Sequence, residues 1–545
     1  MSVSVARVLA SVSEDPADFH PCSGSIARRY IIVSVILIVL CAAHAIWIGA
    51  PRFPYDDPYI TVRNAQVLVS GSHDHTFIGT PALAGSTSIV HTVEVALLML
   101  VFPPLWAATV SQYIGILLYG WSLVALTASG RLQELSSWLL IAVSLTIGSP
   151  FVELLDGLET SLALAAIVFA FALVMSGRPS RWLMVLAGVL PFIRPELSAI
   201  SLLLFAWHTF LRVKAASDQY RASLILRDIG FAVLGALPFA ILLLWNTGSI
   251  VPSTISAKRF YFAEAHLAPS VRWRWVSGNL RDFGRVIGPL TLGTLFLLTD
   301  AWGALLLSFV PLFVMAFYLQ FPGALGHYDH RYMYVLAPFA VAGICRGLRS
   351  QTRAARVLSL LLLIATAGQQ AMGLQRHWKK YVSFCAIAET ELTALSKFCA
   401  ESLDPHARLL IHDAGYMAYA THFEMVDFVG LKTPAAIPLH RELTYPSAGA
   451  DRHKAIDLLA RQTKPDYLIV LNAWDGIFRI TKGLEKDGWQ FEPVRPQSDR
   501  DPVAPQFHYS VYRMSRKDAT NGASATADGL APATGSSRGM VKRTP

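Results

Sequence analysis

Residues 30–50 read YIIVSVILIVLCAAHAIWIGA, an apolar run without a single Asp, Glu, Lys or Arg. The run meets the roughly 20 residues that an α-helix needs to cross a hydrocarbon core of about 30 Å. Arg28 and Arg29 come directly before it, and basic residues gather on the cytoplasmic side of membrane helices. We therefore expect a first transmembrane helix whose N-terminal end lies in the cytoplasm.

Apolar runs of this kind recur along the chain. The protein is 53% hydrophobic and 15% charged, with a mean hydropathy of +0.44, whereas an average soluble domain has about 25% charged residues. We predict a polytopic α-helical membrane protein with 11 to 13 transmembrane helices. The further apolar runs lie at 93–129, 138–152, 161–176, 182–193, 197–211, 229–251, 286–298, 302–326, 332–344 and 357–374.

Basic residues between the runs set the expected orientation. They cluster around 178–181, 212–227 and 346–356, which predicts that these loops are cytoplasmic. The loops at 50–88 and 247–285 and everything after residue 374 then face the other side. Much of the net charge of +9 lies in the cytoplasmic loops, which argues against a nucleic-acid partner.

The composition changes after the last run. Short strand-like segments at 408–412, 467–471 and 508–514 accompany helix-like segments at 377–403 and 452–462. Cys385 and Cys399 fall 14 residues apart on the first of these helices, about 21 Å, too far for a disulfide. We predict four parts, namely a cytoplasmic tail (1–28), a transmembrane region (29–374), an extracytoplasmic α/β domain (375–516) and a disordered tail (517–545).

Two adjacent carboxylates, Asp56 and Asp57, follow the first helix. Like charges and burial both raise carboxyl pKa values, so such a pair favours a proton, a cation or a substrate hydroxyl. The alternative is structural, with Asp57 as the N-cap and Pro58 as the first residue of a helix.

Several other charged residues fall on the same expected face of the membrane. Lys258 ends the segment that follows one apolar run, His327, Arg331 and Tyr332 precede another, and Arg194 and Glu196 lie where two runs meet. Such cations can hold an anionic lipid phosphate. For Arg194 and Glu196 a structural pair that ties two helices together is an equal alternative. Asp156, next to Glu159, is a further candidate whose alternative role is helix capping.

Seven short segments follow one another along the chain: DDPYITVRNA (56–65), GLET (157–160), RPE (194–196), SIVPSTISAK (249–258), RY (331–332), IHDAGYMAY (411–419) and VDFVGL (426–431). In this order they resemble the GT-C superfamily of membrane glycosyltransferases, and within it the mycobacterial terminal arabinofuranosyltransferase type. The resemblance covers residues 29–515.

The resemblance implies an inverting enzyme that moves a sugar, with arabinofuranose as a candidate, from a polyprenyl-phosphate donor to a glycan, glycolipid or protein acceptor. It implies a bacterial inner-membrane location, with the C-terminal domain in the periplasm or outside, and membrane lipid around the helices. The family's general base maps onto Asp56, so Asp57→Asn is expected to impair transfer less than Asp56→Asn. The site residues expected are, for catalysis, Asp56 and Asp57; for the donor phosphate, Lys258, Arg331 and Arg194; and for substrate, Arg63, Glu159, Glu196, Tyr332 and His327.

Three alternatives stay open, one of which is a structural partner in an envelope assembly that binds proteins through residues 377–515. A transporter or flippase of a lipid-linked saccharide would line its pathway with similar charges, although no internal repeat is evident. The segment His73, Asp74, His75 departs from the family pattern and raises the question of a divalent cation, but two histidines in a solvated loop are more often bystanders. We assign no metal site.

Overall fold

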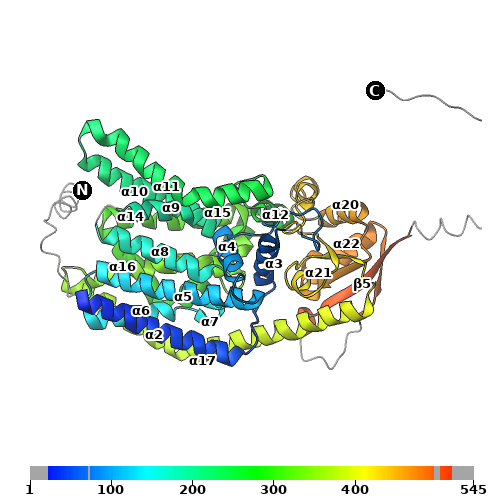
Figure 1. Cartoon of the computed structure of the whole chain (residues 1–545), viewed down its shortest axis with the longest axis horizontal. Coiled ribbons are helices and arrows are strands. Elements are labelled where there is room, and N and C mark those ends of the chain that lie inside the picture. Colours follow the sequence, from blue (N-terminus) through cyan, green and yellow to red (C-terminus); the bar gives the residue numbers. More distant parts are fainter. Residues whose placement is uncertain (1–22, 72–73, 178–179, 496–503, 518–545) are drawn as a thin grey trace, which may run out of the picture.

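The computed structural model describes residues 23–71, 74–177, 180–495 and 504–517. Figure 1 shows a large helical part and a smaller α/β part side by side, joined along one edge by the long helix α17 (Arg353–Ser402). Residues 1–22 of the predicted tail at 1–28, residues 518–545 of the predicted tail at 517–545, and His73 lie outside the described residues.

The helical part follows the predicted runs. Proline or glycine stands at many of the breaks between its elements, as expected for residues that end or begin helices. Its elements are α2 (Ser23–Ile48), α3 (Asp57–Ser70), α4 (Ile89–Leu98), α5 (Pro104–Ser129), α6 (Glu134–Leu145), α7 (Pro150–Leu154), α8 (Thr160–Met175), α9 (Arg181–Ile193), η2 (Pro195–Leu197), α10 (Ser198–Ala215), α11 (Asp218–Thr247), α12 (Ser253–Phe262), η3 (Glu264–His266), α13 (Pro269–Ile287), η4 (Gly288–Thr299), α14 (Ala301–Leu307), α15 (Phe309–Gln320), η5 (Pro322–Gly326), η6 (Arg331–Leu336) and α16 (Ala337–Leu348).

The number of crossings is not confirmed. Within the described ranges, six helical stretches are long and apolar enough to cross a membrane, and α4, α6, α8 and α9 are shorter apolar helices. Many large apolar side chains of α2 and α11 are exposed, as expected for helices that face lipid. The six stretches are Gly24–Ile48, Pro104–Ser129, Pro195–Ala215, Asp218–Thr247, Ala301–Gln320 and Arg353–Ser402.

Small residues allow the helices to approach closely. A Cβ atom at Gly188 of α9 would overlap the carbonyl oxygen of Ala232 in α11, and one at Gly235 of α11 would overlap the carbonyl oxygen of Val185 in α9. The two backbones therefore touch, the arrangement that small residues permit between membrane helices.

The C-terminal part contains a five-stranded mixed sheet. Its strand order is β2-β1-β3-β5-β4; β1 pairs in parallel with β2 and β3, and β5 pairs antiparallel with β3 and β4. The predicted strands correspond to β1, β3 and β5, and the predicted helix at 452–462 to α20. The elements are β1 (Arg408–Ile411), α18 (Tyr416–Ala420), β2 (Glu424–Asp427), α19 (Ala436–Leu439), the π-helical η7 (His440–Thr444), α20 (Arg452–Thr463), β3 (Tyr467–Leu471), α21 (Asn472–Phe478), α22 (Ile480–Lys486), β4 (Trp489–Pro493), η8 (Pro505–Phe507) and β5 (Tyr509–Arg516).

Helix α17 corrects one prediction. We expected the last apolar run to end at residue 374 and a separate helix to begin at 377, but both belong to one helix of 50 residues. No proline or glycine separates the two halves between residues 374 and 402, so nothing in the local sequence ends the helix there. Cys385 and Cys399 are buried on it as free thiols.

Candidate functional site

A break between two helices carries Arg194 into the interior. A residue before proline is disfavoured in the α conformation, and Arg194, which precedes Pro195, has φ −152° and ψ 132°. The extended backbone ends α9 at Ile193, and η2 begins with Pro195. The Arg194 side chain is fully buried.

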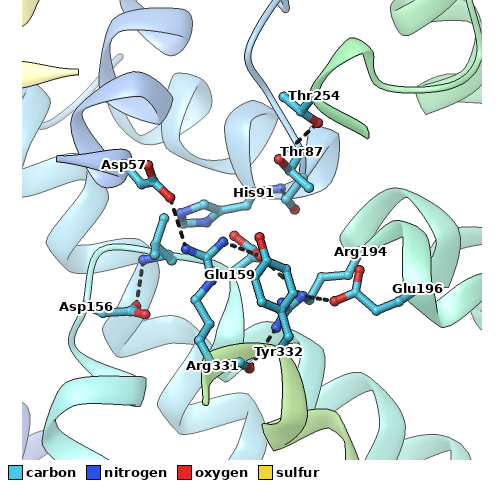
Figure 2. Close-up of polar contacts among 12 residues, drawn as sticks. Asp57, Thr87, His91, Asp156, Glu159, Arg194, Glu196, Thr254, Arg331 and Tyr332 are labelled. Atoms are coloured by element: carbon cyan, nitrogen blue, oxygen red, sulfur yellow. Dashed lines mark hydrogen bonds and ion pairs between the residues drawn. The ribbon is translucent and has the colours of Figure 1, made fainter. Parts of the chain in front are cut away.

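Two arginines and three carboxylates form one network at this break (Figure 2). Glu159 Oε1 lies 3.4 Å from Arg194 Nε and 3.4 Å from Arg331 Nη2. Arg194 Nε also lies 2.8 Å from Glu196 Oε1, and Arg331 Nη1 lies 3.4 Å from Asp57 Oδ2. The network joins residues that are 274 positions apart in the sequence.

Tyr332 is surrounded by the cations of this site. Its ring centroid lies 5.0 Å from the guanidinium carbon of Arg194, 5.4 Å from that of Arg331 and 5.9 Å from Lys258 Nζ. Lys258 Nζ also donates a hydrogen bond of 3.2 Å to the Tyr332 hydroxyl. The three cations predicted to hold a phosphate are therefore brought together around one aromatic ring, which attracts cations through its π face.

The charges of the network oppose the effect of burial on the pKa values of Glu159 and Lys258. Burial alone would raise the pKa of Glu159, but Arg331 and Arg194 lower it to about 2. Burial would lower the pKa of Lys258, yet Tyr332 and Asp57 raise it above its ordinary value. Asp57 is the more open carboxylate, with 23% of its side chain exposed against 4% for Glu159.

The 50–88 and 247–285 segments meet beside this network. Thr87, at the end of the 50–88 loop, donates a 3.2 Å hydrogen bond to Thr254 at the start of α12 (Figure 2). The segment that carries Lys258 is thereby held against the segment that carries Asp57.

His327 borders the network in a backbone of unusual conformation. Tyr328, Asp329 and His330 have φ angles of 44°, 58° and 70°, and three left-handed non-glycine residues in succession cost roughly 1–3 kcal/mol each. The segment is held by the stack of Tyr328 on Tyr55, with centroids 3.8 Å apart, and by an ion pair of Asp329 with Lys380 in α17. Burial lowers the pKa of His327 to about 4, so this imidazole is neutral at pH 7.

Asp56 points away from the network, toward the C-terminal part. Its Oδ2 and Oδ1 accept backbone hydrogen bonds from Gly415 (2.8 Å) and Tyr416 (2.6 Å) at the start of α18. Burial and the nearby charge of Asp413 raise its pKa well above the ordinary value, although the two N–H groups act in the other direction.

The structure does not bear out the alternative in which Asp57 caps a helix. Helix α3 begins at Asp57, so Asp56 is its N-cap residue, and Asp56 makes no capping hydrogen bond with its side chain. Its carboxylate oxygens are taken by α18 instead. Asp57 lies inside the first turn and contacts Arg331, so neither carboxylate has the capping role that the alternative gave to Asp57.

Gly415→Ala is expected to weaken the attachment of the C-terminal part. A Cβ atom at this position would overlap the carbonyl oxygen of Asp56 and lie 2.7 Å from its Oδ2, and such overpacking typically costs about 1–3 kcal/mol. Limited proteolysis and the thermal unfolding midpoint should show a less stable protein. The matched control is Gly476→Ala, since a Cβ atom there meets nothing within 4 Å; equal stability of the two variants would contradict the prediction.

Arg63 lies in a different cluster from the other predicted substrate residues. Its Nη2 is 2.8 Å from Asp74 Oδ1, and Lys432 Nζ is 3.3 Å from Asp74 Oδ2 and 2.7 Å from Asn64 Oδ1. Asp74 is therefore engaged by two cations, while His75 is exposed. The cluster ties the loop after α3 to the C-terminal part, and within the described ranges no group of three or more His, Cys, Asp and Glu could hold a metal ion.

Sequence reasoning missed Glu153. It is 1% exposed, and neither carboxylate oxygen has a hydrogen-bond partner among the described residues. Burial and the charges of Asp156 and Asp329 raise its pKa well above the ordinary value. Its signal was its place at the end of an apolar run, where an ionisable residue suggests function.

Asp156 and His91 complete the polar layer beside Glu159. Asp156 Oδ1 accepts a 2.8 Å hydrogen bond from the backbone of Leu158, and burial raises its pKa to about 7. His91 Nε2 lies 3.3 Å from the carbonyl oxygen of Gly157. These contacts shape the turn that presents Glu159, consistent with a structural role for Asp156.

A family model described as a domain of unknown function, DUF8728, matches residues 382–512. Two solved structures of arabinofuranosyltransferase AftD from Mycobacteria are similar at 13% identity. One covers 90% of this chain with a TM-score of 0.42, and a mutant form covers 89% with a TM-score of 0.45. This chain spans 40% and 41% of the length of those chains. No curated protein matches. The matched family model names no activity, so the function is argued from the site.

Proposed function

We propose that this protein is an inverting glycosyltransferase that uses a polyprenyl-phosphate sugar at the outer face of the bacterial inner membrane. The observation that carries the proposal is the group of cations around Tyr332, next to the partly open carboxylate of Asp57. A lipid phosphate is an anion held at the membrane surface, and Lys and Arg are the side chains that bind phosphate.

Asp57, Lys258 and Arg331 each have a separate role in the proposed reaction. An acceptor hydroxyl oxygen forms a bond to the anomeric carbon of the donor, while the bond from that carbon to the phosphate oxygen breaks. The hydroxyl proton moves to the Asp57 carboxylate, and the electron pair of the broken bond leaves with the phosphate, giving polyprenyl phosphate. Lys258 and Arg331 stabilise the charge that develops on this leaving group, the type of stabilisation that usually contributes most. A single displacement of this kind inverts the anomeric carbon.

The geometry favours Asp57 over Asp56 as the proton acceptor. Both carboxylate oxygens of Asp56 accept hydrogen bonds from backbone N–H groups at the start of α18. The Asp57 side chain, in contrast, is 23% exposed and contacts Arg331. This reverses the ranking that the sequence suggested. The remaining charges then have supporting roles, since Glu159 and Glu196 fix Arg194 and Arg331 through the contacts described above.

The decisive test uses the purified full-length protein in detergent. Radiolabelled polyprenyl-phosphate sugars, arabinofuranose among them, are supplied with candidate glycan, glycolipid and protein acceptors, and release of polyprenyl phosphate is measured. We expect consumption of one donor without a second membrane compartment. A protein that consumes none of them in detergent but moves a lipid-linked saccharide across reconstituted vesicles would be a transporter, and the proposal would be wrong.

A further inference from the structure

Asp413, in the C-terminal part, is a carboxylate held in a fixed orientation with free acceptor capacity. It follows β1 and precedes α18. The Tyr509 hydroxyl donates a hydrogen bond to its Oδ2, and His412 Nδ1 lies 3.0 Å from its Oδ1. Yet 23% of its side chain is exposed, and an ionised carboxylate offers about four lone-pair positions.

The proton on His412 can be placed from its other contact. The backbone N–H of Leu471 donates a 3.0 Å hydrogen bond to His412 Nε2, so Nε2 is the acceptor nitrogen and a neutral ring carries its proton on Nδ1. Nδ1 lies 3.0 Å from Asp413 Oδ1, but it is not aligned for a hydrogen bond and has no hydrogen-bond partner among the described residues. Burial alone would raise the pKa of Asp413, but His412 and the Tyr509 hydroxyl hold it below its ordinary value. Asp413 is therefore an ionised, oriented acceptor of hydrogen bonds.

Asp413 faces the site that the membrane region builds. Gly415 and Tyr416, two and three residues after it, bind the carboxylate of Asp56, which is the neighbour of Asp57 in the chain. The charges of Asp57 and Asp413 both act on His327. The Nδ1 atom of His327 is buried and has no hydrogen-bond partner among the residues the structure describes. Polar groups with unused hydrogen-bonding capacity thus come from both parts of the protein.

We propose that Asp413 binds a hydroxyl group of the acceptor, so that the C-terminal domain supplies the acceptor side of the active site. The inference rests on the proposed glycosyltransferase function. The argument is that the two substrates need different side chains. The cations around Tyr332 suit the donor phosphate, whereas the hydroxyl groups of a neutral sugar substrate need groups that accept hydrogen bonds. Asp413 is such a group, and its substrate class is a sugar hydroxyl of a glycan or glycolipid acceptor.

The experiment compares two reactions of the same donor, transfer of its sugar to an acceptor and hydrolysis by water. Full-length wild-type and variant proteins in detergent receive a polyprenyl-phosphate sugar with a panel of octyl glycosides, and both transfer to the best octyl glycoside and slow hydrolysis by water are measured. Asp413→Asn is expected to raise the KM for the octyl glycoside about 10- to 100-fold, the effect of weakening a hydrogen bond to a charged group. Donor hydrolysis and the KM for the donor should stay within about twofold, because these depend on donor binding.

Two further variants separate this role from a structural one. Tyr509→Phe removes the hydroxyl that donates a hydrogen bond to Asp413 and should raise the same KM by a smaller factor. Glu492→Gln, in an exposed pair on β4, should change nothing. An unchanged acceptor KM in Asp413→Asn, or a parallel loss of donor hydrolysis and thermal stability, would overturn the inference while leaving the glycosyltransferase function standing. A wild-type protein that neither transfers nor hydrolyses any donor would overturn both.

Discussion

Asp57→Asn is expected to lower the rate of sugar transfer about 10²- to 10⁴-fold, the usual contribution of a positioned general base. The amide has nearly the same shape as the carboxylate but cannot take the proton of the attacking hydroxyl. It also weakens the contact with Arg331, 3.4 Å away. The measurement is the rate of polyprenyl phosphate release, together with the thermal unfolding midpoint, which should change little because the Asp57 side chain is partly exposed.

Asp56→Asn is the informative comparison. Gly415 and Tyr416 donate to different oxygens of Asp56, and an asparagine has an NH2 group in place of one of them, so one of the two N–H groups would face another donor. We expect this variant to lose stability at the contact with α18 and to lose activity only in proportion. The assignment would be contradicted if Asp56→Asn were inactive with normal stability while Asp57→Asn transferred sugar at the wild-type rate.

Arg331→Lys is expected to raise the KM for the donor by about 10- to 100-fold, because a lysine at a bridging arginine site is not a conservative change. Arg331 reaches Asp57 with one terminal nitrogen and Glu159 with the other. The single ammonium of a lysine cannot keep both contacts and also face a donor phosphate. Steady-state kinetics over a range of donor concentrations measure the effect.

The control for this variant is Arg285→Lys. Arg285 is 72% exposed and pairs with Asp282 on α13, and exposed pairs contribute about 0–1 kcal/mol. It should leave the kinetics and the stability unchanged. Wild-type donor affinity in Arg331→Lys would remove this arginine from the donor site.

The local sequence predicted the parts of the site that depend on breaks between helices. The proline after Arg194 ends a helix, and a charged residue between two apolar runs must find partners in the interior. The gathering of Arg194, Lys258 and Arg331 at one place followed from their expected position on one face of the membrane. Their arrangement around Tyr332 did not, because the apolar periodicity of a helix does not say which neighbouring side chain it meets.

The different binding partners of Asp56 and Asp57 could not be predicted from the sequence. Adjacent residues at the start of a helix point in different directions, and their partners, Arg331 and the backbone of Gly415, lie far along the chain. Strands β2 and β4 were missed for a local reason. Each lies at an outer edge of the sheet and contains acidic residues, as in EMVD and WQFEP, so neither shows the continuous apolar run that marks the equally short β1 and β3.

Helix α17 sets the rotation of the C-terminal part, about the helix axis, relative to the helical part. Lys380 holds the segment beside the site, and Glu391, 11 residues later, holds Arg495 of the C-terminal part; 11 residues make about three turns, so both side chains leave the helix on nearly the same side. One inserted residue between them would rotate the C-terminal part by about 100° and move it by about 1.5 Å. The chain length between these two contacts therefore sets the rotation of the C-terminal part, Asp413 included, relative to the segment beside the site.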